Sequence, residues 1–269
     1  NELPITREPR RLQSEYLFQE AHRQCLAYAL HIHVGVPDRV TALRVMNDAR
    51  PLLPVLYALS CSSAFLEGRK TGLQSSRVLR AFGLPRTGMP EACESLDALD
   101  RLVTTMQQAG LIVDAGQLWW DIRAHHHYPR VEFRICDAVP LVDDVTALAA
   151  LTQAYVARLL DAYENKHMIE PVSRVLLEEN RWRAARFGTR AELLDYRSGS
   201  LAPLAAIVAD LQAALELHAA QLGTARHLHR VLQIAAQGSA ADRQLAAWDP
   251  AEGDLTRVVA VYLAETAIL

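Results

Sequence analysis

The stretch from Trp119 to Asp137 constrains the fold most, because apolar and charged residues alternate along it. Between Arg130 and Cys136 every second residue is apolar, which is the period of a strand with one buried face. Residues 117–124 alternate in a similar way, and the residues between the two runs have the composition of a turn. The sequence therefore predicts a β-hairpin with strands at 117–124 and 130–137. Its polar face would carry Asp121, Arg123, Glu132 and Arg134.

Four charged side chains on one rigid face suit a phosphate group and a metal ion. An arginine binds phosphate oxygens through a planar fork of donors that stays charged at any working pH. Carboxylate oxygens are ligands that magnesium prefers. Because paired strands bring the residues of one face close together, we expect this hairpin to lie in the functional site.

A second alternating run ends the strand that we predict at residues 27–36. It places His31, His33 and Gly35 on one face and the apolar residues between them on the other. A single histidine on a half-buried strand is usually a hydrogen-bonded structural residue, whereas a pair followed by a glycine favours a functional role. The run of three histidines at 125–127 is a weaker signal, since successive side chains in a tight turn do not converge on one ion.

Composition excludes several classes of protein. The chain has 269 residues, 51% of them hydrophobic, with 28 basic and 31 acidic residues and a formal net charge of -3. We expect a single domain over residues 1–269. The charge balance gives no broad basic field for nucleic acid, and no apolar run is long enough to span a membrane. The four cysteines form no CxxC pair and are expected to be free. The expected partners are small molecules in the cytoplasm, with room for a homo-oligomer.

Most of the remaining chain is predicted to be helical, which makes the fold class α+β. Helical spacing of apolar residues predicts helices at 10–29, 39–60, 95–109 and 143–164. Asp38 and Asp143 would cap the second and the fourth, and Pro51 and Pro54 would break the second. After a turn at 197–200, helices are predicted at 201–222, 225–236 and 255–269, so the C-terminal third is expected to be entirely helical.

Two further segments gather basic residues. Residues 61–77 form a loop of small and hydroxyl-bearing residues that ends at Arg77, and residues 172–188 carry Arg181 and Arg186 on a predicted helix. The loop is explained more readily as a solvated connection than as an anion site. The helix is explained equally well as a solvated face with Glu–Arg pairs. Both segments keep two interpretations at this point.

Four motifs in this order resemble the bacterial carboxylate–amine ligases of the glutamate–cysteine ligase type 2 family. They are HIHVGV at 31–36, ALSCSSAFLEGRKTGLQSSR at 58–77, LWWDIRAHHHYPRVEFRICD at 118–137 and ENRWRAARFG at 179–188. The resemblance covers nearly the whole chain. It implies a curved antiparallel sheet of the glutamine synthetase-like type, packed by helices, that holds ATP and a divalent metal on its concave face. VEFR is similar to the strand that binds metal and phosphate in that larger group.

The implied reaction is ATP-dependent. A carboxylate attacks the terminal phosphate of ATP to give an acyl phosphate, and an amine then displaces phosphate to form an amide, by family default between glutamate and cysteine. The resemblance implies Glu132 and His31 as ligands of Mg²⁺. It implies Arg134 as the catalytic group on the transferred phosphoryl and Arg123 as the group that binds the substrate carboxylate or a phosphate edge. Nucleotide contacts are implied for His33, Arg77, Arg181 and Arg186.

The chain also departs from the family pattern. Members generally have a further N-terminal portion with a Glu-rich strand that supplies metal ligands, and this chain starts after it. Ala64 stands where the family usually has proline, and the turn at 124–130 differs from the usual Pro-Ser-Pro-His-Phe-Gly-Thr. Two alternatives therefore stay open: a catalytically silent binding or regulatory homologue on the same fold, and a metal-dependent hydrolase built on His31, His33 and Glu132.

Overall fold

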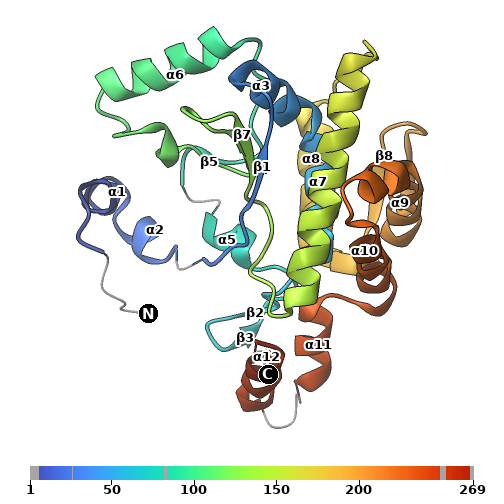
Figure 1. Cartoon of the computed structure of the whole chain (residues 1–269). Helices are drawn as coiled ribbons and strands as arrows, with labels where there is room; N and C mark the ends of the chain where they lie inside the picture. The colour runs from blue at the N-terminus through green and yellow to red at the C-terminus, as the bar shows by residue number, and fades with distance from the viewer. Residues whose placement is uncertain (1–5, 26, 82–83, 249–252, 267–269) are drawn as a thin grey trace.

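The fold is built around a three-stranded antiparallel sheet in the order β1-β7-β6. The computed structural model describes residues 6–25, 27–81, 84–248 and 253–266. Strand β1 is Ile32–Gly35, β6 is Ile122–Ala124 and β7 is Arg130–Phe133. Figure 1 shows this sheet on one side of a group of long helices. The mixed helix and sheet content agrees with the predicted α+β class.

The strands are antiparallel as predicted, but they are shorter than the alternation indicated. Residues 119–120 form β5 (Trp119–Trp120), which pairs in parallel with β4 (Thr87–Gly88) instead of extending the hairpin. Asp121 lies between the two ladders, because its N–H donates to the oxygen of Gly88 and its carbonyl accepts from the N–H of Arg134. Beyond β7 the pairing with the segment before β1 continues as an isolated bridge between Ala29 and Asp137.

Two helices cover the apolar face of the sheet. Helix α3 (Arg39–Asp48) packs against β6 and β7, and α7 (Val142–Glu164) packs against β1. The carboxylate of Asp38 accepts from the N–H of Thr41 at 2.7 Å, so the predicted cap of α3 is confirmed. The predicted cap at Asp143 is wrong, because α7 begins one residue earlier, after Leu141.

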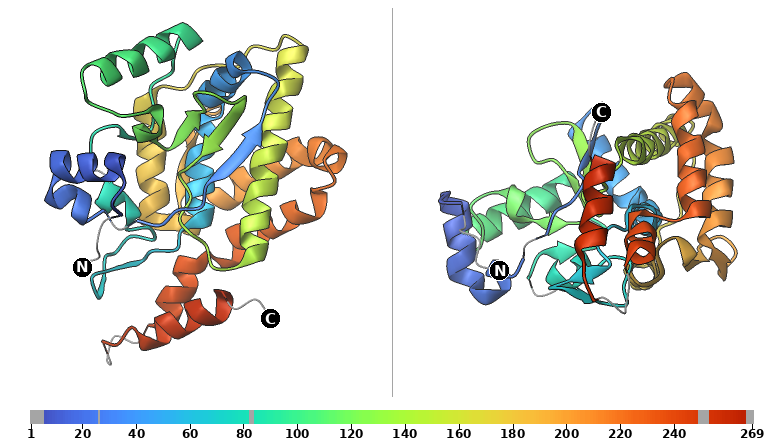
Figure 2. Two further views of the ribbon diagram at one scale, coloured as in Figure 1. Left: turned by 60° about the vertical axis from the view of Figure 1, so that its left-hand side comes forward. Right: turned by 90° about the horizontal axis from the view of Figure 1, so that it is seen from below.

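The break at the prolines is also confirmed, since α3 gives way to η1 (Arg50–Leu52) and then to α4 (Leu53–Ser60). Every residue of α4 is buried, and the helix packs against α8 (Arg174–Phe187). Helices α9 (Leu204–Gln221) and α10 (Ala225–Gln237) pack against α7. Figure 2 shows α7 between the sheet and this outer pair of helices.

The C-terminal third is not entirely helical. Strands β8 (Glu192–Asp195) and β9 (Ser200–Pro203) form an antiparallel hairpin where the sequence predicted a turn followed directly by helix. Gly199 has a φ of 70°, which glycine adopts without a steric penalty and which lets the chain reverse there. The predictions also missed α11 (Ala240–Ala247), although a capping box marks its start. Helix α12 (Thr256–Thr266) follows, and residues 267–269 of the predicted last helix lie outside the described residues.

The predicted helix at 10–29 is divided. Helices α1 (Pro9–Phe18) and α2 (Glu20–Arg23) are separated by Gln19, whose φ of 47° is incompatible with a continuous helix. The predicted helix at 95–109 is confirmed as α6 (Leu96–Gln108) with Ser95 as its cap. The remaining short elements are β2 (Phe65–Leu66), β3 (Arg69–Lys70), α5 (Arg77–Ala81), η2 (Ala115–Gln117) and η3 (Gly188–Arg190).

The four cysteines, Cys25, Cys61, Cys93 and Cys136, are free, as predicted, and two of them, Cys61 and Cys136, are buried. Burial raises the pKa of Cys136 to about 12, so this thiol stays protonated at neutral pH. Among the described helices, none combines the length and the apolar character that crossing a bilayer requires.

The central position of Phe133 gives a stability prediction. Its fully buried ring lies between Ile32 and Ile122 on the neighbouring strands. Phe133→Ala should lower the free energy of unfolding by about 4 kcal/mol, because it removes apolar contacts and leaves a cavity. Urea denaturation measures this loss. Phe133→Leu should lose less than half as much, and equal losses from the two variants would contradict the packing described here.

Candidate functional site

The polar face of the sheet carries a row of three titratable side chains across its middle. The register places Glu132 on β7 opposite both His33 on β1 and Arg123 on β6. Arg134 and His31 lie beside this row. Nη1 of Arg134 is 3.5 Å from Nδ1 of His31 and 3.6 Å from Oε2 of Glu132. The structure therefore brings together five of the side chains that the alternation placed on this face.

Glu132 is the buried acceptor at the centre of the row, with only 3% of its surface exposed. Nε and Nη2 of Arg123 donate to its Oε2 at 3.0 and 2.5 Å. Nδ1 of His33 and Nη2 of Arg130 each lie 3.6 Å from its Oε1. Burial alone would raise the pKa of Glu132, but Arg123 and the other nearby cations hold it below its ordinary value. Glu132 is thus an ionised carboxylate that is already surrounded by cationic partners.

Arg123 is held from both sides. Besides its two bonds to Glu132, its Nη1 donates to the backbone oxygens of Ala115, Gly116 and Leu118 at 2.8 to 3.1 Å. These contacts fix η2 and the start of β5 against the sheet. They also leave Arg123 few donors for a ligand, although its side chain borders the cavity described next.

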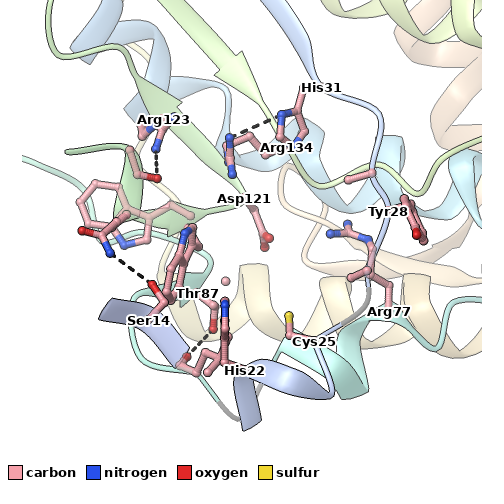
Figure 3. A pocket seen from close by; sticks show the side chains of 18 of the residues that line it. Ser14, His22, Cys25, Tyr28, His31, Arg77, Thr87, Asp121, Arg123 and Arg134 are labelled. Carbon is pink, nitrogen blue, oxygen red and sulfur yellow. Dashed lines mark hydrogen bonds between the residues drawn. The ribbon is translucent and has the colours of Figure 1, made fainter. Parts of the chain in front are cut away.

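A cavity of about 550 Å³ lies beside the row, and arginine dominates its lining. Figure 3 shows side chains from the sheet, from α1 and α2 and from the segment around Arg77 converging on it. Asp121 is the one carboxylate among the described residues that line the cavity. The six lining arginines are Arg10, Arg11, Arg77, Arg123, Arg134 and Arg181. This balance makes the cavity electropositive and suited to an anion.

Arg134 is only loosely compensated, because the Oε2 of Glu132, 3.6 Å from its Nη1, already accepts from Arg123. The Nε of Arg134 is buried and has no hydrogen-bond partner among the described residues. Burial and the nearby Arg123 lower the pKa of Arg134 to about 10, so it remains charged at neutral pH. Burial, together with Arg134, also lowers the pKa of His31 to about 4, which keeps that ring neutral. A bound anion would offset the repulsion between cations that, after burial, contributes to both shifts.

Arg181 reaches the cavity from α8. Its Nε lies 2.6 Å from Oδ2 of Asp121, and 5% of its side chain is exposed. Burial by itself would lower the pKa of Arg181, but the neighbouring Asp121 carboxylate raises it overall. Because α8 also buries Asn180, the explanation of segment 172–188 as a solvated helix face is wrong for this side of the helix.

Several predicted site residues do not meet in the cavity. His33 and Glu132 lie on the polar face but outside the cavity lining. Arg186 is placed elsewhere, because its Nη1 donates to the backbone oxygen of Gly72. The described residues contain no group of three or more His, Cys, Asp or Glu side chains placed to hold a metal ion. The assignment of Glu132 and His31 to magnesium therefore stays a prediction.

No pattern in the sequence indicated that α1 contributes to the cavity. Arg10, Arg11 and Ser14 come from this helix, which lies about a hundred positions earlier in the chain than the hairpin. Nε2 of Gln117 donates to Oγ of Ser14 at 3.3 Å, and the rings of Phe18 and Trp119 meet edge to face. No local pattern reports such long-range contacts, so these residues could be found only in the folded chain.

The buried Arg123–Glu132 pair predicts a pH-dependent stability. Glu132→Gln should lower the free energy of unfolding at pH 7 by about 3 kcal/mol, because it leaves Arg123 without its counter-charge. The folded-state pKa of Glu132 is depressed, so its contribution is complete above the ordinary pKa of a glutamate and is lost as the pH falls through the folded value.

Urea denaturation of the wild type and of Glu132→Gln at a series of pH values measures this contribution. The difference in free energy of unfolding between the two proteins should narrow below about pH 4.3, the ordinary pKa of a glutamate. The double variant Arg123→Met/Glu132→Gln should recover part of the loss, since it removes the unpaired charge. A difference that stays constant down to the lowest pH at which both proteins fold would contradict the prediction.

Comparison with known proteins places the chain in a family. The family model described as glutamate-cysteine ligase family 2 matches residues 2–261. A protein of Sorangium cellulosum is 39% identical over 230 residues, which are 86% of this chain and 61% of that protein. One of Solibacter usitatus is 36% identical over 91% of this chain and 63% of its own length. One of Herpetosiphon aurantiacus is 34% identical over 92% of this chain and 64% of its own length.

All three relatives carry glutamate–cysteine ligase 2 as a provisional name. The chain spans slightly less than two thirds of the length of each of them. The family model, in contrast, covers nearly all of this chain, including the hairpin, the loop at 61–77 and α8. On this match, the chain belongs to glutamate-cysteine ligase family 2.

Proposed function

We propose that the protein is an ATP-dependent carboxylate–amine ligase that forms an amide through an acyl phosphate. Membership of glutamate-cysteine ligase family 2 supports the reaction class. The observation that carries the proposal is the arginine-lined cavity beside the polar face, with Asp121 as the one carboxylate among its described lining residues. A triphosphate is the kind of ligand that this excess of positive charge would bind.

The charge of the cavity matches the demands of phosphoryl transfer. Negative charge spreads over the oxygens of the transferred group, so fixed cations close to it lower the barrier. Arg134 is our candidate for this role, because it is charged and its buried Nε has no hydrogen-bond partner among the described residues. Arg77 and Arg181 would bind the remaining phosphate oxygens, each held in place by a carboxylate.

His31 would act as a neutral partner of Arg134. With a pKa lowered to about 4, its ring adds no charge at neutral pH, and its Nδ1 faces Nη1 of the arginine. It can therefore orient the guanidinium without competing for the anion. Glu132 likewise orients the guanidinium of Arg123, most of whose donors are bound to acceptors within the protein.

The described residues do not by themselves make a magnesium site. Glu132 is enclosed by arginine and histidine donors, and Asp121 is engaged by Arg181. A magnesium ion prefers several oxygen ligands, usually including waters. The contribution of this chain's own residues is therefore the charge neutralisation that its arginines supply.

The acid and the amine are proposed from the family. The names of the relatives favour glutamate and cysteine as the pair that is joined. A small carboxylate would have to reach the terminal phosphate near Arg134, and the lining of the cavity by Arg10 and Arg11 on α1 is compatible with an acidic substrate. No cysteine of the chain is needed as a nucleophile, because ATP activates the acyl group.

The complete gene product should release ADP when ATP, magnesium and glutamate are supplied, and cysteine should accelerate the release. Arg134→Lys should lower the rate by at least ~100-fold while ATP binding stays detectable, because an ammonium group cannot reproduce a two-pronged grip on the phosphoryl oxygens. A coupled ADP assay measures the rate, and calorimetry measures the binding.

Arg101→Lys is the matched control, since Arg101 is exposed on α6 and lies outside the cavity lining. It should leave both quantities unchanged. Full activity of Arg134→Lys would refute the assignment of Arg134. A gene product that binds ATP but never turns it over with any amine would instead indicate a catalytically silent homologue.

A further inference from the structure

A single buried carboxylate, Asp137, connects the loop at 61–77 to the end of the sheet. It follows β7, and its backbone forms an isolated bridge with Ala29. Only 2% of Asp137 is exposed. An ionised carboxylate at such a depth needs several hydrogen-bond donors to offset its lost hydration.

Asp137 obtains these donors from both ends of the loop. Its Oδ2 accepts from the N–H of Ser62 at 2.9 Å and from Oγ of Ser63 at 2.8 Å. Its Oδ1 accepts from Oγ of Ser75 and from Nε of Arg77, both at 2.9 Å. The hydroxyls that suggested an anion loop in the sequence are therefore directed at a carboxylate of the protein. The two ends of the loop are not a solvated connection either, because Ser62, Ser75 and Ser76 are buried, whereas its tip at 67–70 is exposed.

The orientation of Arg77 follows from this network. Nε is bound to Asp137, and Nη2 donates to the backbone oxygen of Ile135. No described residue accepts a hydrogen bond from Nη1, and the side chain borders the cavity. In Figure 3, Arg77 and Asp121 approach the cavity from different segments of the chain. Asp137 thus holds one edge of the guanidinium and leaves the other edge for a ligand.

Arg181 is held in a comparable way. Its Nε forms an ion pair with Asp121, as the Nε of Arg77 does with Asp137. Burial by itself would lower the pKa of Arg77, and the Asp137 carboxylate raises it overall. Two arginines that come from different helices therefore enter one cavity, each fixed through the same nitrogen by a buried aspartate. Fixing a side chain before binding reduces the entropy lost when the ligand binds.

We propose that Asp137 is a positioning residue that orients Arg77 toward the phosphate groups of the nucleotide. This inference rests on the proposed function. Asp137 does not touch the ligand, and its effect on binding is transmitted through Arg77. The hydroxyls of Ser63 and Ser75 hold the carboxylate in place beside Arg77.

A double-mutant cycle on the complete gene product tests the inference, with ATP as the probe and calorimetry as the measurement. Asp137→Asn and Arg77→Met should each weaken ATP binding by about 10-fold, the loss expected for one charge-assisted contact. The double variant should be no weaker than Arg77→Met alone, because Asp137 acts only through Arg77.

Asp144→Asn is the matched control. Asp144 is also 2% exposed, and its Oδ1 accepts from Nε of Arg230 at 2.7 Å, but neither residue lines the cavity. This variant should lower the melting temperature and leave the affinity for ATP unchanged. The comparison separates a loss of orientation from a general loss of stability.

Independent effects, with the double variant about 100-fold weaker than the wild type, would overturn the inference. Unchanged ATP affinity in Asp137→Asn would also overturn the inference. So would unchanged ATP affinity in Arg77→Met, if Arg134→Lys still lowers the rate of turnover. In both cases the proposed function would survive. A wild type that neither binds ATP nor releases ADP would refute the proposed function and the inference together. Should Asp137→Asn not fold, Ser75→Ala removes one bond to Asp137. Its smaller loss of affinity should vanish in the Arg77→Met background, and a loss that persists there would overturn the inference.

Discussion

The pairing of β7 with β1 and β6 is the constraint on which the rest of the structure depends. One face of these strands buries Phe133 and its two neighbours against α3 and α7. Since side chains alternate along a strand, the opposite face then has to present Glu132 between His33 and Arg123. A slip of one residue in register would move Glu132 into the apolar core. The burial of apolar side chains therefore fixes the position of the charged ones.

Buried carboxylates hold three of the arginines that line the cavity in fixed orientations. Glu132, Asp121 and Asp137 are buried, and each binds the Nε of one arginine: Arg123, Arg181 and Arg77 respectively. In each pair the acid offsets the cost of burying a cation and fixes its direction. Arg134 differs from these three, because its nearest carboxylate oxygen, Oε2 of Glu132, lies 3.6 Å from its Nη1 and already accepts from Arg123. Arg134 therefore stands to gain from binding an anion.

The local patterns were reliable where the neighbours in sequence decide the conformation. Alternation predicted the polar face, and Asp38 predicted the start of α3. The local patterns failed where contacts between segments far apart in the sequence determine the conformation. Trp119 and Trp120 alternate like a strand of the hairpin, yet they pair with β4 because Asp121 joins two ladders. The loop at 61–77 has the composition of a solvated connection, but both of its ends are buried around Asp137.

The sequence by itself determined which residues share a face, because the two-residue period of a strand and the geometry of a helix cap are local properties of the backbone. It also carried the motifs by which the family is identified. Only the tertiary structure decided that Arg77, Arg134 and Arg181 meet in one cavity with α1 beside them. It likewise decided that Glu132 is enclosed by cations and that Asp137 is paired with Arg77. The physical reason is that burial and charge pairing depend on segments far apart in the chain, and no local spacing encodes their distance.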